Sequence, residues 1–178
     1  MTPQTRTVAA STTSATKVYG SGDDAVYALR DVSVDFYEGQ FTAIMGPSGS
    51  GKSTLIRHIN RLIEPTAGSI MIGGEDVIQM PMEKLRQFRQ QKTAMVFQSF
   101  ALLPHKTIMD NVCLGVHLQG VKGDDAITRA KKWIDRVGLS GYEDRYPSQL
   151  SGGMQQRVGL ARALTCDTEI LMMDEAFS

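Results

Sequence analysis

Short apolar runs, separated by glycines and polar turns, predict that strands and helices alternate along this chain. Residues 32–36 alternate apolar and polar side chains, which is the period of a half-exposed antiparallel strand. Residues 41–45 and 169–173 are mostly apolar, as expected of short buried strands. Further strands are expected at residues 17–19, 69–72 and 93–97.

Other segments have the character of helices. Residues 107–116 and 124–137 are amphipathic, and Asp124 and Asp125 suit the start of the second segment because carboxylates favour a helix N-terminus. The remaining helices are expected at residues 52–62, 81–88 and 152–164.

Residues 1–16 are rich in Thr, Ser and Ala, and Arg6 is their one charged residue, which predicts a disordered tail. A transit peptide is the alternative, although such peptides usually carry more arginine. The rest of the chain divides into a core at 17–98, a helical insertion at 99–150, and a helix followed by a strand at 151–178. This order predicts an α/β nucleotide-binding core that carries a helical subdomain.

Composition narrows the class of protein. Lys plus Arg and Asp plus Glu both number 19, so the formal net charge is zero, whereas a nucleic-acid-binding protein usually has a basic surplus. Cys113 and Cys166 lie in apolar surroundings and are interpreted as buried thiols in a reducing compartment. The sequence contains neither an apolar run of about 18 residues, as a membrane span requires, nor the apolar core of a secretory signal.

A glycine-rich loop between an expected strand and an expected helix predicts a phosphate site. Its glycines allow backbone N–H groups to point at phosphate oxygens, and the helix N-terminus favours an anion. Lys52 is expected to reach the β- and γ-phosphates of a nucleotide, and Ser53 to bind Mg²⁺. The nucleotide-binding residues predicted here are Gly46, Ser48, Gly49, Ser50, Gly51, Lys52, Ser53 and Thr54.

Two carboxylates follow the last apolar strand, at the strand end where α/β sheets place their ligands. Asp174 is expected to support Mg²⁺, and Glu175 to act as the general base that polarises the attacking water. Gln98 follows the strand at 93–97, and its neutral amide could contact Mg²⁺ or the water. With Lys52, Glu175 and Gln98 form the predicted catalytic set, and Ser53, Gln98 and Asp174 the predicted metal ligands.

Ser151, Gly152 and Gly153 precede a helix that carries Gln155, Gln156 and Arg157. A serine N-cap followed by exposed N–H groups forms an anion site. An ordinary capped helix would have the same spacing, so the local pattern leaves both interpretations open.

The order of these motifs resembles that of the ATPase subunit of an ABC transporter, over nearly all of residues 19–178. The resemblance implies a P-loop NTPase (RecA-like) α/β core with an antiparallel β subdomain and an inserted α-helical subdomain. It implies ATP and Mg²⁺ as cofactors, and a homodimer in which Ser151 and Gly153 face the γ-phosphate held by the partner. It also implies that Tyr19 stacks on adenine, with Tyr27 as a second candidate and a core or edge aromatic as the alternative for Tyr19.

Residues 60–66, 95–105 and 173–178 resemble the glycine betaine/proline (quaternary amine) uptake ATPases. The resemblance implies that the region from Gln98 to His105 receives a transmembrane permease, and that a substrate-binding protein takes part indirectly. It places the subunit in the cytoplasm, peripherally on the inner face of the membrane, without nucleic acid.

In that family the chain continues beyond the acidic strand end with a D-loop and a switch histidine. We therefore expect a partial sequence, truncated after the strand at residues 169–173 and its two carboxylates, the Walker B strand of that family, and such a chain would bind ATP weakly and hydrolyse it poorly. A soluble ABC ATPase acting on ribosomes or nucleic acid, or an inactive fragment, are the alternatives.

Overall fold

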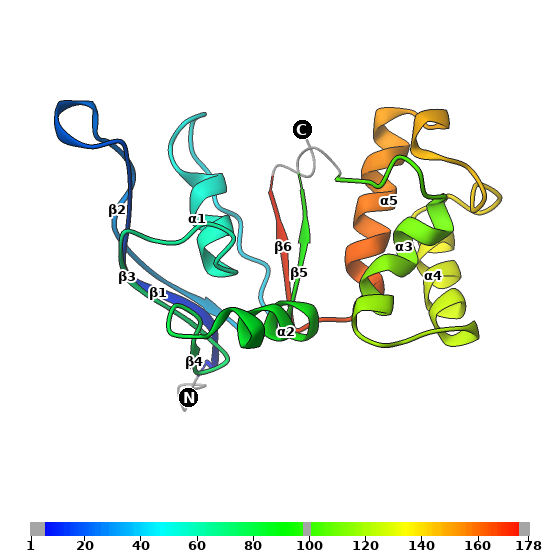
Figure 1. Ribbon diagram of the computed structural model, residues 1–178, viewed down its shortest axis with the longest axis horizontal. Helices are drawn as coiled ribbons and strands as arrows, with labels where there is room; N and C mark the ends of the chain where they lie inside the picture. The colour runs from blue at the N-terminus through cyan, green and yellow to red at the C-terminus, as the bar shows by residue number, and fades with distance from the viewer. Residues whose placement is uncertain (1–5, 98–100, 175–178) are drawn as a thin grey trace, which may run out of the picture. The chain divides into compact units, whose positions relative to one another are not determined.

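The computed structural model describes residues 6–97 and 101–174. The chain forms two compact units, Met1–Leu85 and Arg86–Ser178, and the boundary falls within helix α2 (Met82–Lys92). Figure 1 shows the elements of each unit. Among the described residues, none of the helices has both the length and the apolar character that crossing a membrane requires.

The first unit contains an antiparallel four-stranded sheet in the order β2-β1-β3-β4. Its strands are β1 (Val8–Tyr19), β2 (Val26–Tyr37), β3 (Ala67–Ile72) and β4 (Glu75–Asp76), and the short helix η1 (Gly22–Asp24) lies between β1 and β2. Helix α1 (Lys52–Ile59) contacts β1, β2 and β3. The antiparallel β subdomain expected from the sequence is therefore present.

The prediction of a disordered tail at residues 1–16 is wrong from Val8 onward, because β1 begins there and is hydrogen-bonded to both β2 and β3. Ala10, Thr12 and Ala15 are its buried side chains, and Thr12 Oγ1 donates to the Val32 carbonyl at 3.0 Å. Small and β-branched residues suit a strand that packs closely between two others. Their low hydrophobicity gave the segment the composition of a disordered tail.

The buried strand predicted at residues 41–45 is also not observed. This segment forms no strand, and the side chains of Phe41 and Met45 are 89% and 88% exposed. Within the described part of the chain no strand pairs with it. Because burial of an apolar strand depends on neighbours on both edges and both faces, the apolar pattern alone does not produce it.

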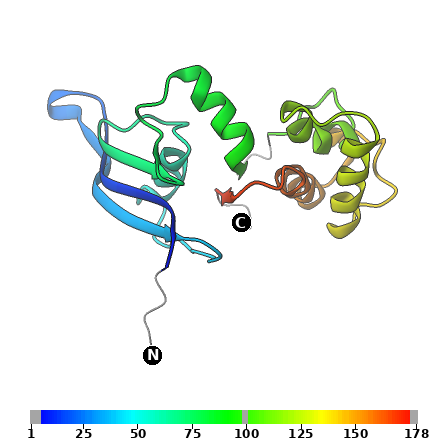
Figure 2. The same ribbon diagram turned by 90° about the horizontal axis from the view of Figure 1, so that it is seen from below.

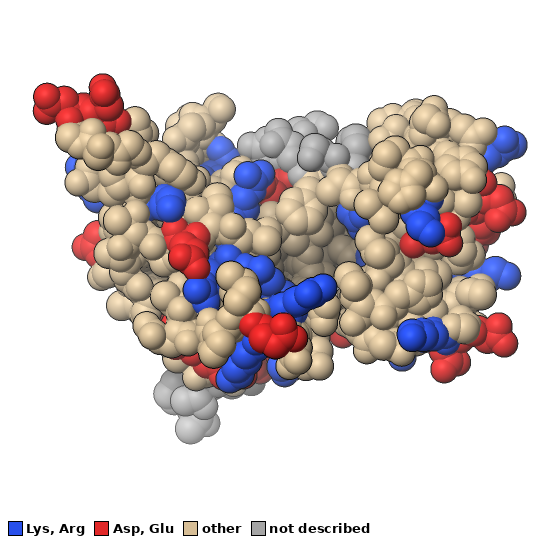
Figure 3. All heavy atoms as spheres, viewed as in Figure 1, with Lys and Arg blue, Asp and Glu red and all other residues tan. Residues whose placement is uncertain are grey.

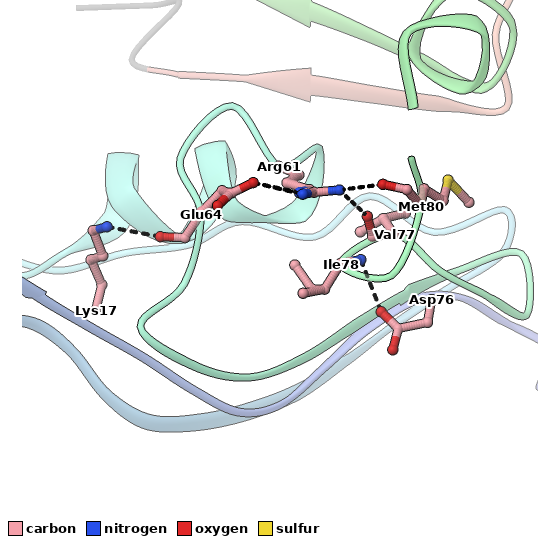
Figure 4. Close-up of polar contacts among 7 residues, drawn as sticks. All are labelled: Lys17, Arg61, Glu64, Asp76, Val77, Ile78 and Met80. Carbon is pink, nitrogen blue, oxygen red and sulfur yellow. Dashed lines mark hydrogen bonds and ion pairs between the residues drawn. The ribbon is translucent and has the colours of Figure 1, made fainter. Parts of the chain in front are cut away.

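The end of α1 is fixed by Arg61 (Figure 4). The helix was expected to reach residue 62, but it ends at Ile59, and Arg61 has a φ of +52°. The Arg61 guanidinium donates to Glu64 Oε1 through Nε at 3.0 Å and Nη2 at 2.6 Å, and through Nη1 to the carbonyls of Val77 at 3.1 Å and Met80 at 2.8 Å. This planar fork holds the end of α1 to the loop after β4.

The second unit has a parallel pair of strands and a cluster of helices. Strands β5 (Thr93–Val96) and β6 (Ile170–Met173) pair with Thr93 opposite Ile170. Helices α3 (Ile108–Leu118), α4 (Asp124–Arg136) and α5 (Gly152–Thr165) pack together, and the short helix η2 (Pro147–Gln149) precedes α5. Figure 2 shows α5 nearly end-on beside the other two helices.

The helices of this unit share one apolar core. Residues of α3, α4 and α5 all contribute to this core. The boundary predicted at residue 150, between the helical insertion and the helix after it, therefore passes through one core rather than separating two. The core comprises Ile108, Val112, Cys113, Val116, Ala126, Ala130, Ile134, Leu139, Leu150, Val158 and Ala161. The amphipathic segments at 107–116 and 124–137 were predicted within two residues of the observed ends of their helices.

His58 lies in the last turn of α1 and is fully buried. Its Nδ1 lies 2.7 Å from the Thr54 carbonyl oxygen, whereas Nε2 has no hydrogen-bond partner among the described residues. Burial lowers the pKa of His58 below its usual 6.5, and Lys17 adds to the effect, while the bond to Thr54 opposes it. The native structure therefore favours the neutral imidazole.

We predict that His58 makes stability fall in acid. A histidine whose pKa is lower in the native than in the unfolded state contributes its full stability above pH 6.5, and this contribution is lost as the pH falls below that value. In urea titrations, His58→Met should lose part of the decline in unfolding free energy seen in the parent protein below pH 6.5. The exposed His117→Gln should keep the decline, and equal pH profiles for the parent and His58→Met would contradict the prediction.

Candidate functional site

The glycine-rich loop meets the sheet of the first unit at Gly51. This residue has a φ of +91°, and a Cβ built on it would lie 2.3 Å from the Ala28 carbonyl oxygen and 3.2 Å from Leu29 Cδ2. The β1–β2 register also shifts beside Ala28, between the pairs Lys17–Leu29 and Val18–Tyr27. Only glycine fits this contact, because any side chain would collide with the backbone of β2.

Lys52 starts α1 directly after the loop. Its Nζ donates to the carbonyls of Gly46 and Pro47, at 2.9 Å each, so the ammonium group lies across the loop rather than extending into solvent. The Ser50 N–H donates to the Pro47 carbonyl at 3.3 Å, which closes a turn within the loop. Residues 46–50 are exposed, so the cation and the start of the helix lie beside backbone that an anion can reach.

Tyr19 lies at the end of β1, directly opposite Val26 of β2, and the two side chains are 45% and 63% exposed. Residues directly opposite each other in an antiparallel pair share one face, so together they form a small apolar surface. Lys17 Nζ lies 5.1 Å from the centroid of the Tyr19 ring. Tyr27, the second candidate, is opposite Val18 instead. The ring of Tyr19 is thus accessible for stacking.

Ser151 is the N-cap of α5, as expected, and its Oγ accepts a hydrogen bond from the Met154 N–H at 3.3 Å. Gly152 and Gly153 are exposed, and a Cβ built on either would meet no atom within 4 Å. The first turn of α5 therefore presents backbone donors to an open surface, which is the geometry of an anion site.

Two further side chains of α5 support this turn, and their roles were not predicted from the sequence. Gln155 Nε2 donates to the carbonyls of Pro147 at 3.0 Å and Leu150 at 3.2 Å, just before the turn. Arg157 Nη1 donates to the carbonyl of Val137 at 2.8 Å, just after α4 ends. Gln155 and Arg157 thus bind the segments before α5 and after α4 to α5, so the roles of these two residues are structural.

Asp174 follows β6 and is almost fully buried, and its backbone N–H donates to the Val96 carbonyl at 3.0 Å. A buried carboxylate at the carboxyl end of parallel strands occupies the usual ligand position of such sheets. Gln98 and Glu175 lie outside the described residues.

The predicted residues thus fall into two groups. The loop residues and Tyr19 lie in the first unit, and the Ser151 turn and Asp174 in the second. On the face drawn in Figure 3, acidic and basic side chains are interspersed.

Comparison with known proteins identifies the family of this chain. The profile described as ABC transporter matches residues 29–178. The glycine betaine transport ATP-binding protein OpuAA of Bacillus subtilis is 57% identical over 150 residues, which cover 84% of this chain and 36% of the relative. The glycine betaine/proline betaine transport protein ProV of Escherichia coli is 51% identical, with coverage of 84% and 38%. The chain therefore spans just over a third of the length of these relatives.

A solved structure, the dimeric post-hydrolysis state of the ATP-binding cassette MJ0796 bound to ADP and Pi, superposes with a TM-score of 0.89 at 35% identity. The match covers 94% of this chain and 74% of the cassette. It confirms the α/β ATPase fold, and together with the matched profile it shows that this chain belongs to the ABC transporter family.

Proposed function

We propose that this chain is the ATP-binding and ATP-hydrolysing part of the subunit that powers an ABC importer. The observation that carries the proposal is the preformed phosphate loop, in which Gly51 is packed on β2 and Lys52 lies across the loop. Because close packing on β2 fixes the backbone at Gly51, little of the binding energy is needed to order that part of the loop.

Different residues described above bind the phosphates, the adenine and the metal ion. The backbone N–H groups of the loop and Lys52 bind the phosphates, and Tyr19 stacks on adenine beside Val26. Ser53, Asp174 and Gln98 supply oxygen ligands, which is the donor set that Mg²⁺ prefers. When bound, the ion neutralises negative charge on the β- and γ-phosphates.

During hydrolysis, each of three residues near the γ-phosphate has its own role. Glu175 accepts a proton from the attacking water as general base, and Gln98 orients that water. Lys52 exchanges its bonds to the loop carbonyls for phosphate oxygens and stabilises the charge that develops on them.

The turn at Ser151 acts on the nucleotide of a partner subunit. Its backbone donors face open space, and the similar MJ0796 cassette is dimeric in the solved structure. In a homodimer, each turn would complete the phosphate site of the other subunit, so that ATP binding closes the dimer and hydrolysis allows it to reopen.

The transported substrate is glycine betaine, proline or a related quaternary amine. The support is the identity of 57% with a glycine betaine transport ATP-binding protein and of 51% with a glycine betaine/proline betaine transport ATP-binding protein. The region from Gln98 to His105 receives the permease, and a substrate-binding protein delivers the substrate to that permease. The subunit then lies on the cytoplasmic face of the membrane, and its formal net charge of zero lacks the basic surplus usual in a nucleic-acid-binding protein.

The first test is ATP hydrolysis by the full-length protein. Glu175→Gln removes the base and should lower kcat by about 100-fold or more, while ATP binding measured by titration calorimetry stays within about twofold. Lys52→Ala should weaken ATP binding itself. The exposed Lys131→Ala on α4 is the control and should behave as the parent protein does. Unchanged hydrolysis in Glu175→Gln would refute the assignment of the base.

The second test separates binding from closure. Ser151→Arg places a bulky cation at the open turn and should leave ATP binding by the phosphate loop intact, because the turn is proposed to contact the partner's nucleotide rather than its own. Closure should fail, with hydrolysis reduced by about 100-fold and no ATP-dependent dimer in size-exclusion chromatography of a Glu175→Gln background. Thr128→Arg, on the exposed side of α4, adds the same side chain elsewhere and should leave both measurements unchanged. Normal turnover in Ser151→Arg would refute the role of this turn in the partner's site.

A further inference from the structure

The segment from Ala101 to Thr107 lies between β5 and α3 and forms no regular helix or strand. Ala101, Pro104, His105 and Lys106 are exposed, and the Lys106 N–H donates to the Leu103 carbonyl at 3.2 Å. An exposed irregular segment loses much conformational entropy when it takes one shape. Interactions from outside the segment must therefore hold it.

Asn111 of α3 provides the first of these interactions. It is fully buried, and its Oδ1 accepts from the Leu103 N–H at 2.8 Å. Its Nδ2 lies 3.1 Å from the Leu103 carbonyl oxygen, 3.1 Å from that of Lys106 and 2.9 Å from that of Thr107. One amide thus uses its acceptor and both of its donor hydrogens on the segment, which is anchored to α3 at Leu103, Lys106 and Thr107.

Arg162 of α5 provides the second. Its Nη1 donates to the Ala101 carbonyl at 2.7 Å, and Ala101 has a φ of +46°, a left-handed conformation that residues other than glycine rarely adopt. Burial also lowers the pKa of the Arg162 guanidinium. A hydrogen bond from a partly desolvated cation is stronger than one in water, so it can hold Ala101 in this conformation.

The same helix carries the turn at Ser151. Arg162 lies eleven residues after Ser151, or roughly 16 Å along the helix axis. Between them, Gln155 and Arg157 hold the neighbouring chain segments to α5, which makes this helix a rigid connection. Motion of the turn must therefore move the Arg162 guanidinium, and with it the carbonyl of Ala101.

We propose that Arg162 is a positioning residue that couples the Ser151 turn to the segment from Ala101 to Thr107, and that Asn111 anchors the far end of this segment. The inference rests on the proposed function, which assigns the turn to ATP and residues 98–105, which overlap the segment, to the permease. Arg162 does not belong to the nucleotide site as described above. Its loss should therefore uncouple the permease from ATP hydrolysis without stopping hydrolysis.

The experiment uses the full-length protein, alone and reconstituted with its permease in lipid nanodiscs. In Arg162→Gln, basal ATP hydrolysis should stay within about twofold of the parent, whereas stimulation by the permease should fall by about tenfold, the factor that one hydrogen bond to a charged group represents. Amide hydrogen exchange of a peptide covering residues 101–107 should accelerate by a similar factor. Arg162→Lys keeps a hydrogen-bond donor on a shorter side chain. It should therefore lose less of the stimulation by the permease than Arg162→Gln, and its hydrogen exchange should accelerate less.

Arg129→Gln, an exposed arginine of α4, is the matched control and should change neither measurement. Should Arg162→Gln not fold, Arg162→Lys is compared with the parent, and a stimulation equal to that of the parent overturns the proposal. Full stimulation in Arg162→Gln, or a basal rate that falls as much as the stimulated rate, also overturns it. A parent protein that hydrolyses ATP without responding to the permease would refute the permease assignment as well, so the two failures are distinguishable.

Discussion

The contact between Gly51 and the backbone of β2 determines where the phosphate loop lies. A distance of 2.3 Å from a would-be Cβ to the Ala28 carbonyl oxygen excludes every side chain at this position. The loop and the sheet are therefore in contact without an intervening side-chain layer. Since α1 begins at the next residue, the same contact sets the origin and direction of the helix whose N-terminus attracts phosphate.

The C-terminal end of α1 is also fixed in place, but by charged hydrogen-bonding groups rather than by close backbone packing. The Arg61 fork bonds to Glu64 and to two carbonyls of the loop after β4, and Lys17 Nζ donates to the Glu64 carbonyl at 2.8 Å (Figure 4). The helix is thus fixed at the start by close backbone packing and at the end by a charged network. A short helix of eight residues has little stability of its own, so these two attachments maintain the geometry of the loop.

The sequence predicted well those motifs in which one backbone geometry requires a particular type of residue. The glycine at position 51 and the cap at Ser151 impose one backbone geometry each, and the structure shows both. Patterns that depend on distant partners were predicted less well. Ala10 and Ala15 are buried because β2 and β3 flank them, and Phe41 stays exposed because no described strand covers it. The hydrophobic periodicity of a segment shows which of its side chains could be buried. Whether they are buried depends on the strands and helices that lie beside the segment.

The phosphate loop and the Ser151 turn differ in how many of their hydrogen-bonding groups already have partners. At the loop, Lys52 already donates to two carbonyls, so a bound phosphate must replace existing bonds. At the Ser151 turn, one N–H is capped by the serine, while Gly152 and Gly153 face open space. Water satisfies exposed helix donors at little cost, so an open turn is stable in an isolated subunit. In the proposed dimer, an anion brought by a partner would gain both the donors and the helix dipole, which would make ATP between two subunits more favourable than ATP on one.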